Sequence, residues 1–420
     1  MSDPFETRQT LSERLAARRP GYSLEGPFYW DASIFAIELE ELFYRDWLFA
    51  GHASELNRPG DYLTLQVGRY SVVIVRDAKG DIRAFHNNCR HRGSRICTLA
   101  KGRAPKLVCP YHQCTYELDG RLLFAKDKPA DFDPSQFSLK PVAVDEVCGQ
   151  LFICVASNPP DFGAFKAAVS PYLEPHRLDK TKVAFESTIV EQANWKLTLE
   201  NNRECYHCAG SHPELMRSYL DSAAAVARDS TAEDPQLVAQ WQAWEARGLP
   251  SRFLMSESGQ YRVTRAPLAD GAASFTLSGR PAVNRPMGEA TTDAGDLLLF
   301  HFPTTWNHYL GDHATTFRVL PLSPTETAVT TKWHVPADAV EGRDYHVEEL
   351  TAVWAATNDQ DRRLVEENQR GVTSPAYEPG PYMASEGGVD QFVTWYCETL
   401  SQRLTPQTPK LVPMAVGGGG

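Results

Sequence analysis

Four possible metal ligands lie close together in "CRHRGSRICTLAKGRAPKLVCPYH", residues 89–112. This stretch opens with Cys89 and His91 and closes with Cys109 and His112. Two thiolates and two imidazoles in two short loops make a set of four metal ligands. Tetrahedral zinc accepts such a set. So does a [2Fe–2S] cluster that takes two Cys on one iron and two His on the other.

The order of these four donors separates the two options. Zinc fingers usually pair Cys with Cys and His with His, with the histidines on a helix. Here each loop supplies one Cys and one His, so each loop can give a ligand to either iron of a dinuclear cluster. Gly93 and Pro110 fit the tight turns that such loops need. We therefore predict a [2Fe–2S] cluster, with structural zinc as the alternative.

Residues 45–155, which contain the two loops, have the pattern of short β-strands. The segment "DYLTLQVGRYSVVIVRDAKGDIRAFHN" alternates apolar runs with turn signals at Gly68 and Lys79–Gly80. "YELDGRLL" predicts a hairpin around Asp119–Gly120, and "GQLFICVA" predicts one more strand. Several short strands at this spacing predict a small all-β barrel or sandwich.

The rest of the chain mixes helical and strand patterns. Residues 1–44 have helical patterning, and 221–290 are polar and poorly patterned. Further along the chain we predict helices at 196–209, 344–370 and 387–403 and strands within 296–310, 313–322 and 327–335. Strands followed by helices favour an α+β fold. We predict that a small all-β domain, 45–155, is inserted in a larger catalytic domain, formed by 1–44 and 156–420, whose antiparallel sheet is flanked by helices.

Composition narrows the class of protein. A net charge of -11 and a pI near 5.6 argue against nucleic-acid binding and leave room for an acidic docking face. No apolar run reaches the length of a membrane span, and the N-terminus lacks the apolar core of an export signal. The nine cysteines are scattered and odd in number, unlike a disulfide framework. We therefore expect a cytoplasmic protein with no membrane partner.

A second group of possible ligands lies in "ENNRECYHCAGSHPEL", residues 200–215. His207 and His212, with one carboxylate, would complete the two-His-one-carboxylate triad of a non-haem Fe(II) oxygenase. On a continuous helix Glu200, Glu204 and His207 would share one face. Cys205 and Cys208 have the spacing of a redox pair, but nothing nearby supports a thioredoxin-like setting, so we interpret them as packing residues.

These motifs together resemble the Rieske non-haem iron oxygenase α-subunit family. "CRHRG…CPYH" resembles its Rieske motif, and "NWKLTLENNRECYHCAGSHPEL" resembles its mononuclear-iron segment. The resemblance implies a [2Fe–2S] cluster and a mononuclear Fe(II). Its implied cluster ligands are Cys89, His91, Cys109 and His112, and its implied iron ligands are His207, His212 and Asp361.

The third iron ligand and the bridge between the metals depend on the same resemblance. "WAATNDQDRRLVEENQRG" supplies Asp361, with Asp359 as the alternative; without the family, both acids would be a solvated helix face. Glu204 stands where the family has an acid that joins the first iron His to a Rieske His of the neighbouring subunit in a homotrimer. Most ring-hydroxylating members have Asp there, and Glu resembles the trimethylammonium-oxidising branch.

Longer stretches narrow the expected reaction. "RRPGYSL", "DHATTFRVLPLSPTET" and "SPAYEPGPY" look like the glycine betaine monooxygenase group. That group implies O2-dependent N-demethylation of a quaternary ammonium, here glycine betaine to dimethylglycine and formaldehyde. Electrons would come from NAD(P)H through a separate flavin/iron–sulfur reductase. The alternatives are a stachydrine or carnitine-type oxygenase, an aromatic ring-hydroxylating dioxygenase, and a zinc-stabilised binding protein.

A quaternary ammonium donates no hydrogen bonds, so aromatic faces hold it best. Each aromatic residue of the late strands and last helix is more often core than cage. The candidates are Trp306, Tyr309, Phe317, Trp333, Trp395 and Tyr396. The sequence offers no basis for choosing the partner of a substrate carboxylate among the arginines, His308 and His313.

Overall fold

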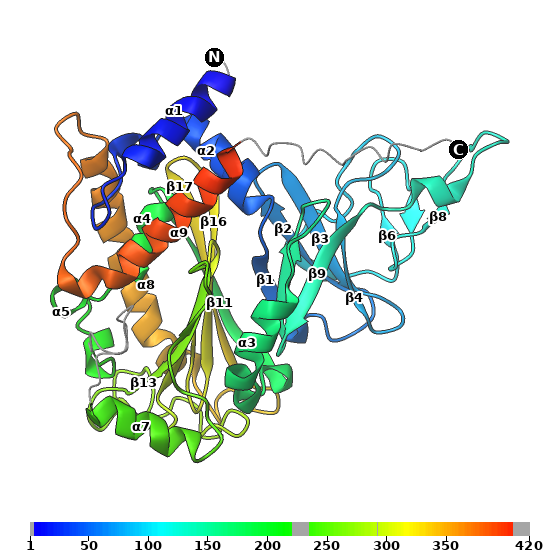
Figure 1. Cartoon of the computed structure of the whole chain (residues 1–420). Helices are drawn as coiled ribbons and strands as arrows, with labels where there is room; N and C mark the ends of the chain where they lie inside the picture. The colour runs from blue at the N-terminus through cyan, green and yellow to red at the C-terminus, as the bar shows by residue number, and fades with distance from the viewer. Residues whose placement is uncertain (1–3, 221–234, 292, 406–420) are drawn as a thin grey trace, which may run out of the picture.

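Residues 48–154 form the all-β part of the molecule. The structure, a computed structural model, describes residues 4–220, 235–291 and 293–405. A seven-stranded antiparallel sheet has the order β1-β10-β9-β4-β3-β2-β5 (Figure 1). Its strands are β1 Leu48–His52, β2 Asp61–Val67, β3 Tyr70–Arg76, β4 Ile82–His86, β5 Lys101–Arg103, β9 Pro141–Val147 and β10 Gln150–Cys154.

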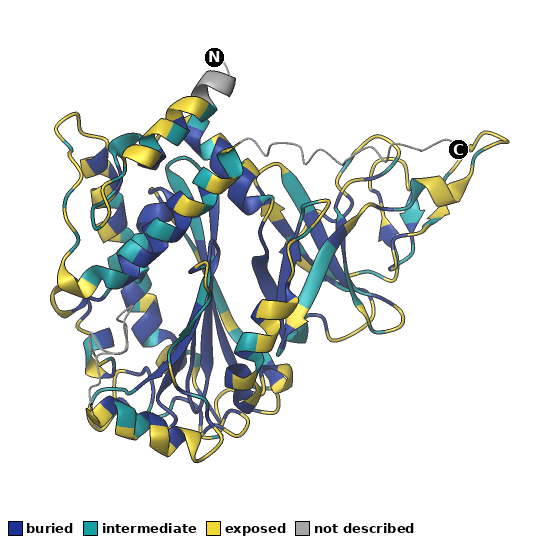
Figure 2. Ribbon diagram, viewed as in Figure 1, coloured by how far each residue is buried: buried dark blue, intermediate teal, exposed yellow. Residues whose placement is uncertain are grey.

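A separate three-stranded sheet carries the outer end of this part. It consists of β6 Leu107–Val108, β7 Thr115–Tyr116 and β8 Leu122–Phe124. β7 and β8 form the predicted hairpin, in which Gly120 takes the left-handed conformation, φ +88°. Many exposed residues gather at this end of the molecule (Figure 2).

Residues 181–336 contain the strands of a larger antiparallel sheet, in the order β11-β17-β16-β15-β14-β13-β12. Its strands are β11 Thr181–Glu191, β12 Leu254–Met255, β13 Tyr261–Ala266, β14 Asp296–His301, β15 Thr305–Tyr309, β16 Ala314–Ser323 and β17 Glu326–Pro336. The last four match the predicted strands. β13 lies in the stretch that showed no pattern, and residues 221–234 of that stretch lie outside the described residues.

Helices cover the sheet and contribute to the core. The α-helices are α1 Pro4–Ala17, α2 Ala32–Glu38, α3 Gly163–Leu173, α4 Trp195–Asn202, α5 Cys208–Ser211, α7 Pro235–Glu245, α8 Val347–Val372 and α9 Gly387–Leu404. The π-helix η2 spans Leu39–Phe43, and the short 3-10 turns are η1 Gly26–Tyr29, η3 Ala53–Glu55, η4 Pro134–Phe137, η5 Glu174–His176, η6 Leu178–Lys180, η7 Leu215–Arg217 and η8 Ala384–Glu386. α4, α8 and α9 lie on one side of the larger sheet, and the all-β part lies on the other (Figure 1). The predicted α+β class, with an antiparallel sheet flanked by helices, is confirmed.

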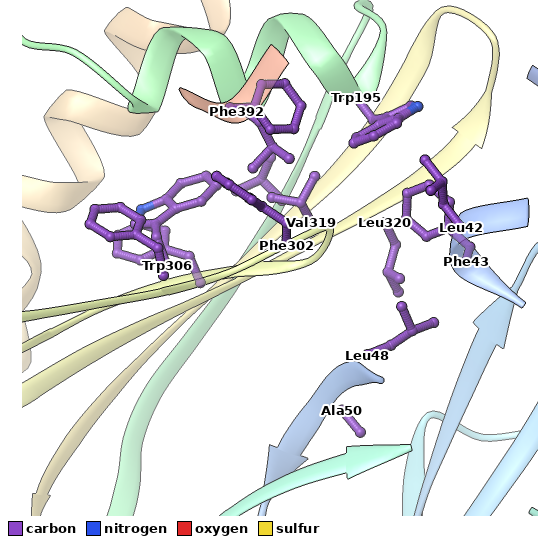
Figure 3. Close-up of a cluster of buried hydrophobic side chains, with 14 of the residues drawn as sticks. Leu42, Phe43, Leu48, Ala50, Trp195, Phe302, Trp306, Val319, Leu320 and Phe392 are labelled. Carbon is purple, nitrogen blue, oxygen red and sulfur yellow. The ribbon is translucent and has the colours of Figure 1, made fainter. Parts of the chain in front are cut away.

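The N-terminal segment joins the two halves. Figure 3 shows Leu42 and Phe43 of η2 with Leu48 of β1, in one cluster with Trp195 of α4 and Leu320 of β16. Buried polar contacts add to this junction: Lys332 Nζ lies 2.6 Å from Glu55 Oε2. The all-β part is thus packed against the larger sheet through a continuous core.

The predicted helix 196–209 is wrong in its second half. α4 ends at Asn202, and a new short helix, α5, begins at Cys208. Between them the Glu204 carboxylate accepts hydrogen bonds from the backbone amides of Tyr206 and His207. Such side-chain acceptors replace helical hydrogen bonds and favour a turn. Glu200, Glu204 and His207 therefore do not share one helix face.

Candidate metal centres

The two Cys/His loops fold alike. In the first, Gly93 N donates to Cys89 O (2.9 Å) and Cys89 N donates to Ser94 O (2.8 Å). In the second, Gln113 N donates to Cys109 O (3.1 Å), and Cys109 N donates to the carbonyl five residues on (2.9 Å). Gly93 and Gln113 both have positive φ, +78° and +62°. The two loops therefore share one turn that begins at the cysteine, and the histidine follows two residues later in the first loop and three residues later in the second.

The four predicted cluster ligands come together with sulfur inside and imidazole outside. Cys89 and Cys109 are buried, whereas His91 and His112 are exposed, with ring centroids 4.7 Å apart. The Tyr116 hydroxyl lies 3.2 Å from Cys89 Sγ. Burial raises the pKa of Cys89, but hydrogen bonds from Tyr116 and the His91 amide outweigh it and lower the pKa below its ordinary value. A lowered pKa favours the thiolate form of Cys89, which is the form that binds iron. The exposed imidazoles suit a [2Fe–2S] cluster that exchanges electrons at its histidine end.

The second centre lies between the α4–α5 segment and α8. His207 Nε2 and His212 Nε2 are 3.0 Å apart, and Asp361 Oδ1 lies 3.3 Å and 3.0 Å from them. Asp361 Oδ1 is buried and makes no hydrogen bond of acceptable geometry in the described structure. Three donors at metal bonds of about 2.1 Å and mutual right angles stand about 3.0 Å apart. The three atoms therefore fit one face of a single ion, as in the two-His-one-carboxylate triad.

The other imidazole nitrogens fix the orientation of both rings. His207 Nδ1 lies 2.5 Å from Glu204 Oε1, and His212 Nδ1 lies 2.8 Å from Gln360 Oε1. Gln360 in turn donates to Glu214 Oε2 at 2.7 Å. Acceptors on Nδ1 keep the proton there and direct the Nε2 lone pairs at the same point. The sequence pointed to Glu204 but not to Gln360, whose role depends on the fold.

The Asn-Trp-Lys motif anchors the helix that leads into this centre. The Asn194 side chain caps α4, and its backbone amide donates to Gln369 of α8 at 2.8 Å. Trp195 Nε1 and Lys196 Nζ both donate to the buried Glu38, at 2.9 Å and 2.5 Å. The Asn194 contact ties α4 to α8, and the two contacts to Glu38 tie α4 to α2, so the helix before the histidines is anchored to the helix that carries Asp361.

Asp361 and Asp359 have different surroundings. Burial raises the pKa of Asp361, but the two imidazoles outweigh it and hold the pKa below its ordinary value. Asp359 instead pairs with Arg362 at 2.6 Å and with Arg363, and its side chain is 45% exposed. Of the two acids, the structure brings only Asp361 to the histidines.

Cys205 and Cys208 form a disulfide, with Cα atoms 4.9 Å apart. The interpretation of this pair as unlinked packing residues is therefore wrong. It rested on the absence of a thioredoxin-like setting, whereas the turn between α4 and α5 brings the two cysteines together. Both residues are buried beside the triad.

None of the six predicted cage residues lines the cavity at the triad. Trp306, Tyr309, Phe317, Trp333, Trp395 and Tyr396 are buried core residues. Figure 3 shows Trp306 among Phe302, Val319 and Phe392, and Tyr396 donates its hydroxyl proton to Glu38 at 2.5 Å. Phe317 reaches Trp354, with centroids 5.1 Å apart, from one layer behind the cavity.

The cavity beside the triad is small, with a volume of about 60 Å³. Its aromatic and imidazole walls are Tyr219, Phe300, His308 and Trp354. Two arginines, Arg203 and Arg262, line it as well. These residues lie on three strands, α8 and two turns, far apart in the chain, so sequence reasoning singled out only His308 among them, as one possible partner of a substrate carboxylate.

Comparison with known proteins identifies the family in which this arrangement occurs. Residues 178–402 match the family described as "Ring hydroxylating alpha subunit (catalytic domain)", and residues 46–132 match the "Rieske [2Fe-2S] domain". The chain belongs to the Rieske oxygenase α subunits. This Rieske oxygenase has, in the described residues, no helix both long and apolar enough to cross a membrane.

Individual relatives cover nearly the whole Rieske oxygenase chain. It is 50% identical to the glycine betaine monooxygenase oxygenase subunit of Chromohalobacter salexigens, over 98% of this chain and 93% of the relative. It is 48% identical to the Pseudomonas aeruginosa protein of the same name, over 96% and 95%. The carnitine-bound structure of the quaternary ammonium Rieske monooxygenase CntA is 22% identical, with TM-score 0.69 over 92% of this chain and 98% of that one, which shows the shared fold.

Family membership fixes the class of enzyme and its cofactors. The chain is a Rieske non-haem iron monooxygenase. It uses a [2Fe–2S] cluster and a mononuclear iron, with O2 as co-substrate. The buried thiols beside exposed imidazoles and the three donors about the buried Asp361 Oδ1 fit these two groups.

Proposed function

We propose that this protein is the oxygenase component of a glycine betaine monooxygenase. It would remove one N-methyl group from glycine betaine, giving dimethylglycine and formaldehyde, with one O2, two electrons and two protons consumed and one water formed. The observation that carries the proposal is the triad of His207, His212 and Asp361, with donors 3.0–3.3 Å apart, in a chain about half identical to two proteins of that name.

The ligand roles belong to the same proposal. Cys89, His91, Cys109 and His112 would hold the cluster within a domain of residues 45–155. His207, His212 and Asp361 would hold the iron within a catalytic domain of residues 1–44 and 156–420. When bound, the two groups supply stored electrons and the activation of O2.

The protein's own residues prepare this site. Glu204 and Gln360 keep the Nδ1 protons of the two histidines, so both Nε2 atoms remain available as ligands. The small volume of the cavity restricts the substrate to a compact molecule. Its aromatic walls suit a trimethylammonium group, which cannot donate hydrogen bonds.

Electron supply leads us to propose a homotrimer and a separate reductase. In the folded molecule the cluster loops lie on one side and α5 lies on the opposite side, with the larger sheet between them (Figure 1). Transfer within one chain would have to cross that sheet. We propose instead that Glu204 connects His207 to His91 or His112 of a neighbouring subunit. An NAD(P)H-dependent flavin/iron–sulfur reductase would supply the electrons, in the cytoplasm, where NAD(P)H is available.

A substrate panel tests the proposed reaction. The iron- and cluster-loaded protein is incubated with a reductase, NADH and O2, and with glycine betaine, stachydrine, carnitine or naphthalene. We expect formaldehyde and the demethylated amine in equal amounts, fastest with glycine betaine, and none without O2. Preference for stachydrine or carnitine would move the enzyme to that branch, and an arene diol from naphthalene would overturn N-demethylation.

A further inference from the structure

Arg203 is a buried cation with unused donors. It is 1% exposed and lines the cavity that also contains His207, His212 and Asp361. Its Nη2 donates to Asn202 Oδ1, but Nε and Nη1 have no hydrogen-bond partner in the described residues. Buried charges are normally paired, because an unpaired donor keeps the full cost of its desolvation. Two unfilled donors beside the triad therefore call for an acceptor from outside the chain.

A second arginine concentrates positive charge at the same place. Arg262 of β13 is 2% exposed and lines the same cavity. The guanidinium carbons of Arg203 and Arg262 lie 3.4 Å and 4.6 Å from the centroid of the Phe300 ring. The shared ring stabilises both cations only in part, since a cation–π contact leaves the N–H donors of a guanidinium group without an acceptor. Two neighbouring guanidinium groups attract an anion more strongly than either one alone.

The cavity carries charge of both signs. The arginines line it together with the carboxylates of Glu204 and Asp361. A zwitterion whose cation and anion are one carbon apart complements such a cavity, whereas a simple cation or an apolar ring leaves the two donors of Arg203 unfilled. We propose that Arg203, assisted by Arg262, binds the carboxylate of a betaine substrate and so turns its N-methyl groups toward His207, His212 and Asp361.

This inference rests on the proposed function and adds the basis of substrate choice. Charge-assisted hydrogen bonds from a guanidinium to a carboxylate are among the strongest polar contacts in proteins. Loss of such a contact inside a buried site costs roughly 1.5–3 kcal/mol, or about 10- to 150-fold in affinity. Selection for a carboxylate over an alcohol of similar size therefore depends on Arg203.

The test compares glycine betaine with choline, which has an alcohol in place of the carboxylate. Equilibrium binding to the iron-loaded, anaerobic protein is measured by calorimetry for the wild type, Arg203→Gln, Arg203→Lys and Arg217→Gln. Arg217 is exposed, does not line the cavity, and controls for the loss of one positive charge nearby. We expect Arg203→Gln to lower the affinity for glycine betaine about 10- to 150-fold and to change the affinity for choline by less than about threefold. The affinity of Arg203→Lys for glycine betaine should lie between those of Arg203→Gln and the wild type.

The outcomes separate the inference from the proposed function. If the wild type binds choline as well as glycine betaine, or if Arg203→Gln keeps the full preference, the carboxylate site is wrong. Iron content and circular dichroism show whether Arg203→Gln folds; if it does not, Arg262→Gln must show the same selective loss, and its failure to do so overturns the inference. Formaldehyde release is scored separately: Arg203-dependent binding without demethylation would keep the site and contradict the proposed reaction.

Discussion

At the scale of single residues, two aspartates of α8 show how the fold distinguishes two neighbouring candidates for one metal ligand. Asp359 and Asp361 stand in one acidic stretch, where sequence spacing favours the second without excluding the first. On the folded helix they are only two residues apart, yet Asp361 is held by two imidazoles and Asp359 by two arginines. The preference for Asp361 came from the family resemblance; its burial and its unfilled oxygen come from the fold.

The pair provides a matched test of the iron site. We expect Asp361→Asn to lose most of its iron and its turnover while it keeps the cluster absorbance, because an amide is a weak, neutral ligand. Asp359→Asn should retain both metals and its activity, since its partners are surface arginines whose ion pairs contribute little. Metal analysis and the reduced Rieske electron paramagnetic resonance signal decide this. Equal iron content in the two variants would remove Asp361 from the ligand set.

At the scale of elements, the sequence located long regular segments well and turns poorly. α8 and α9 differ from their predicted bounds by only a few residues. The break after Asn202 was missed because it depends on hydrogen bonds from the Glu204 carboxylate to two amides, which no periodicity reveals. β11 and β13 were missed because charged residues interrupt their apolar pattern, and only pairing with β17 and β14 makes them strands.

β11 also contains a carboxyl group that should make stability depend on pH. Burial, with the nearby Asp361 and Glu366 charges, raises the pKa of Glu191 from 4.5 to about 7, although a hydrogen bond from Thr198 opposes the shift. The folded protein then holds a proton that the unfolded chain loses above pH 4.5. Stability is therefore lost as the pH rises from about 4.5 to 7, by up to about 3 kcal/mol.

Glu191→Gln removes this dependence. In denaturant unfolding of the iron-free protein, we expect the variant to be more stable than the wild type at pH 8 and nearly equal to it at pH 4.5. Glu186→Gln, on the same strand, is the matched control with the opposite sign. Burial raises the pKa of Glu186, but Lys332 and Lys101 outweigh it and lower the pKa, so its loss should destabilise the protein at pH 8. The same pH slope in wild type and Glu191→Gln would contradict the assignment.

At the scale of the whole molecule, the motifs for the two metal centres are easier to recognise in the sequence than the walls of the cavity. The cluster and iron motifs each lie in a short stretch of sequence, with Asp361 the one distant member. The cavity walls instead come from β13, β14, β15 and α8, so they become neighbours only after the larger sheet forms. The six aromatic residues predicted as a cage have the right chemistry, but they face the core.

The two metal centres lie far apart in one chain. We propose that the chain couples the electrons stored at one centre, together with O2, to the removal of an N-methyl group at the other. A single-turnover experiment tests it most directly. The protein, loaded with both metals and chemically reduced without a reductase, is mixed with O2 and glycine betaine that carries isotopically labelled methyl groups. We predict labelled formaldehyde and dimethylglycine in equal amounts, with oxidation of the cluster. Cluster oxidation without labelled formaldehyde, with both metals shown to be present, would contradict the account.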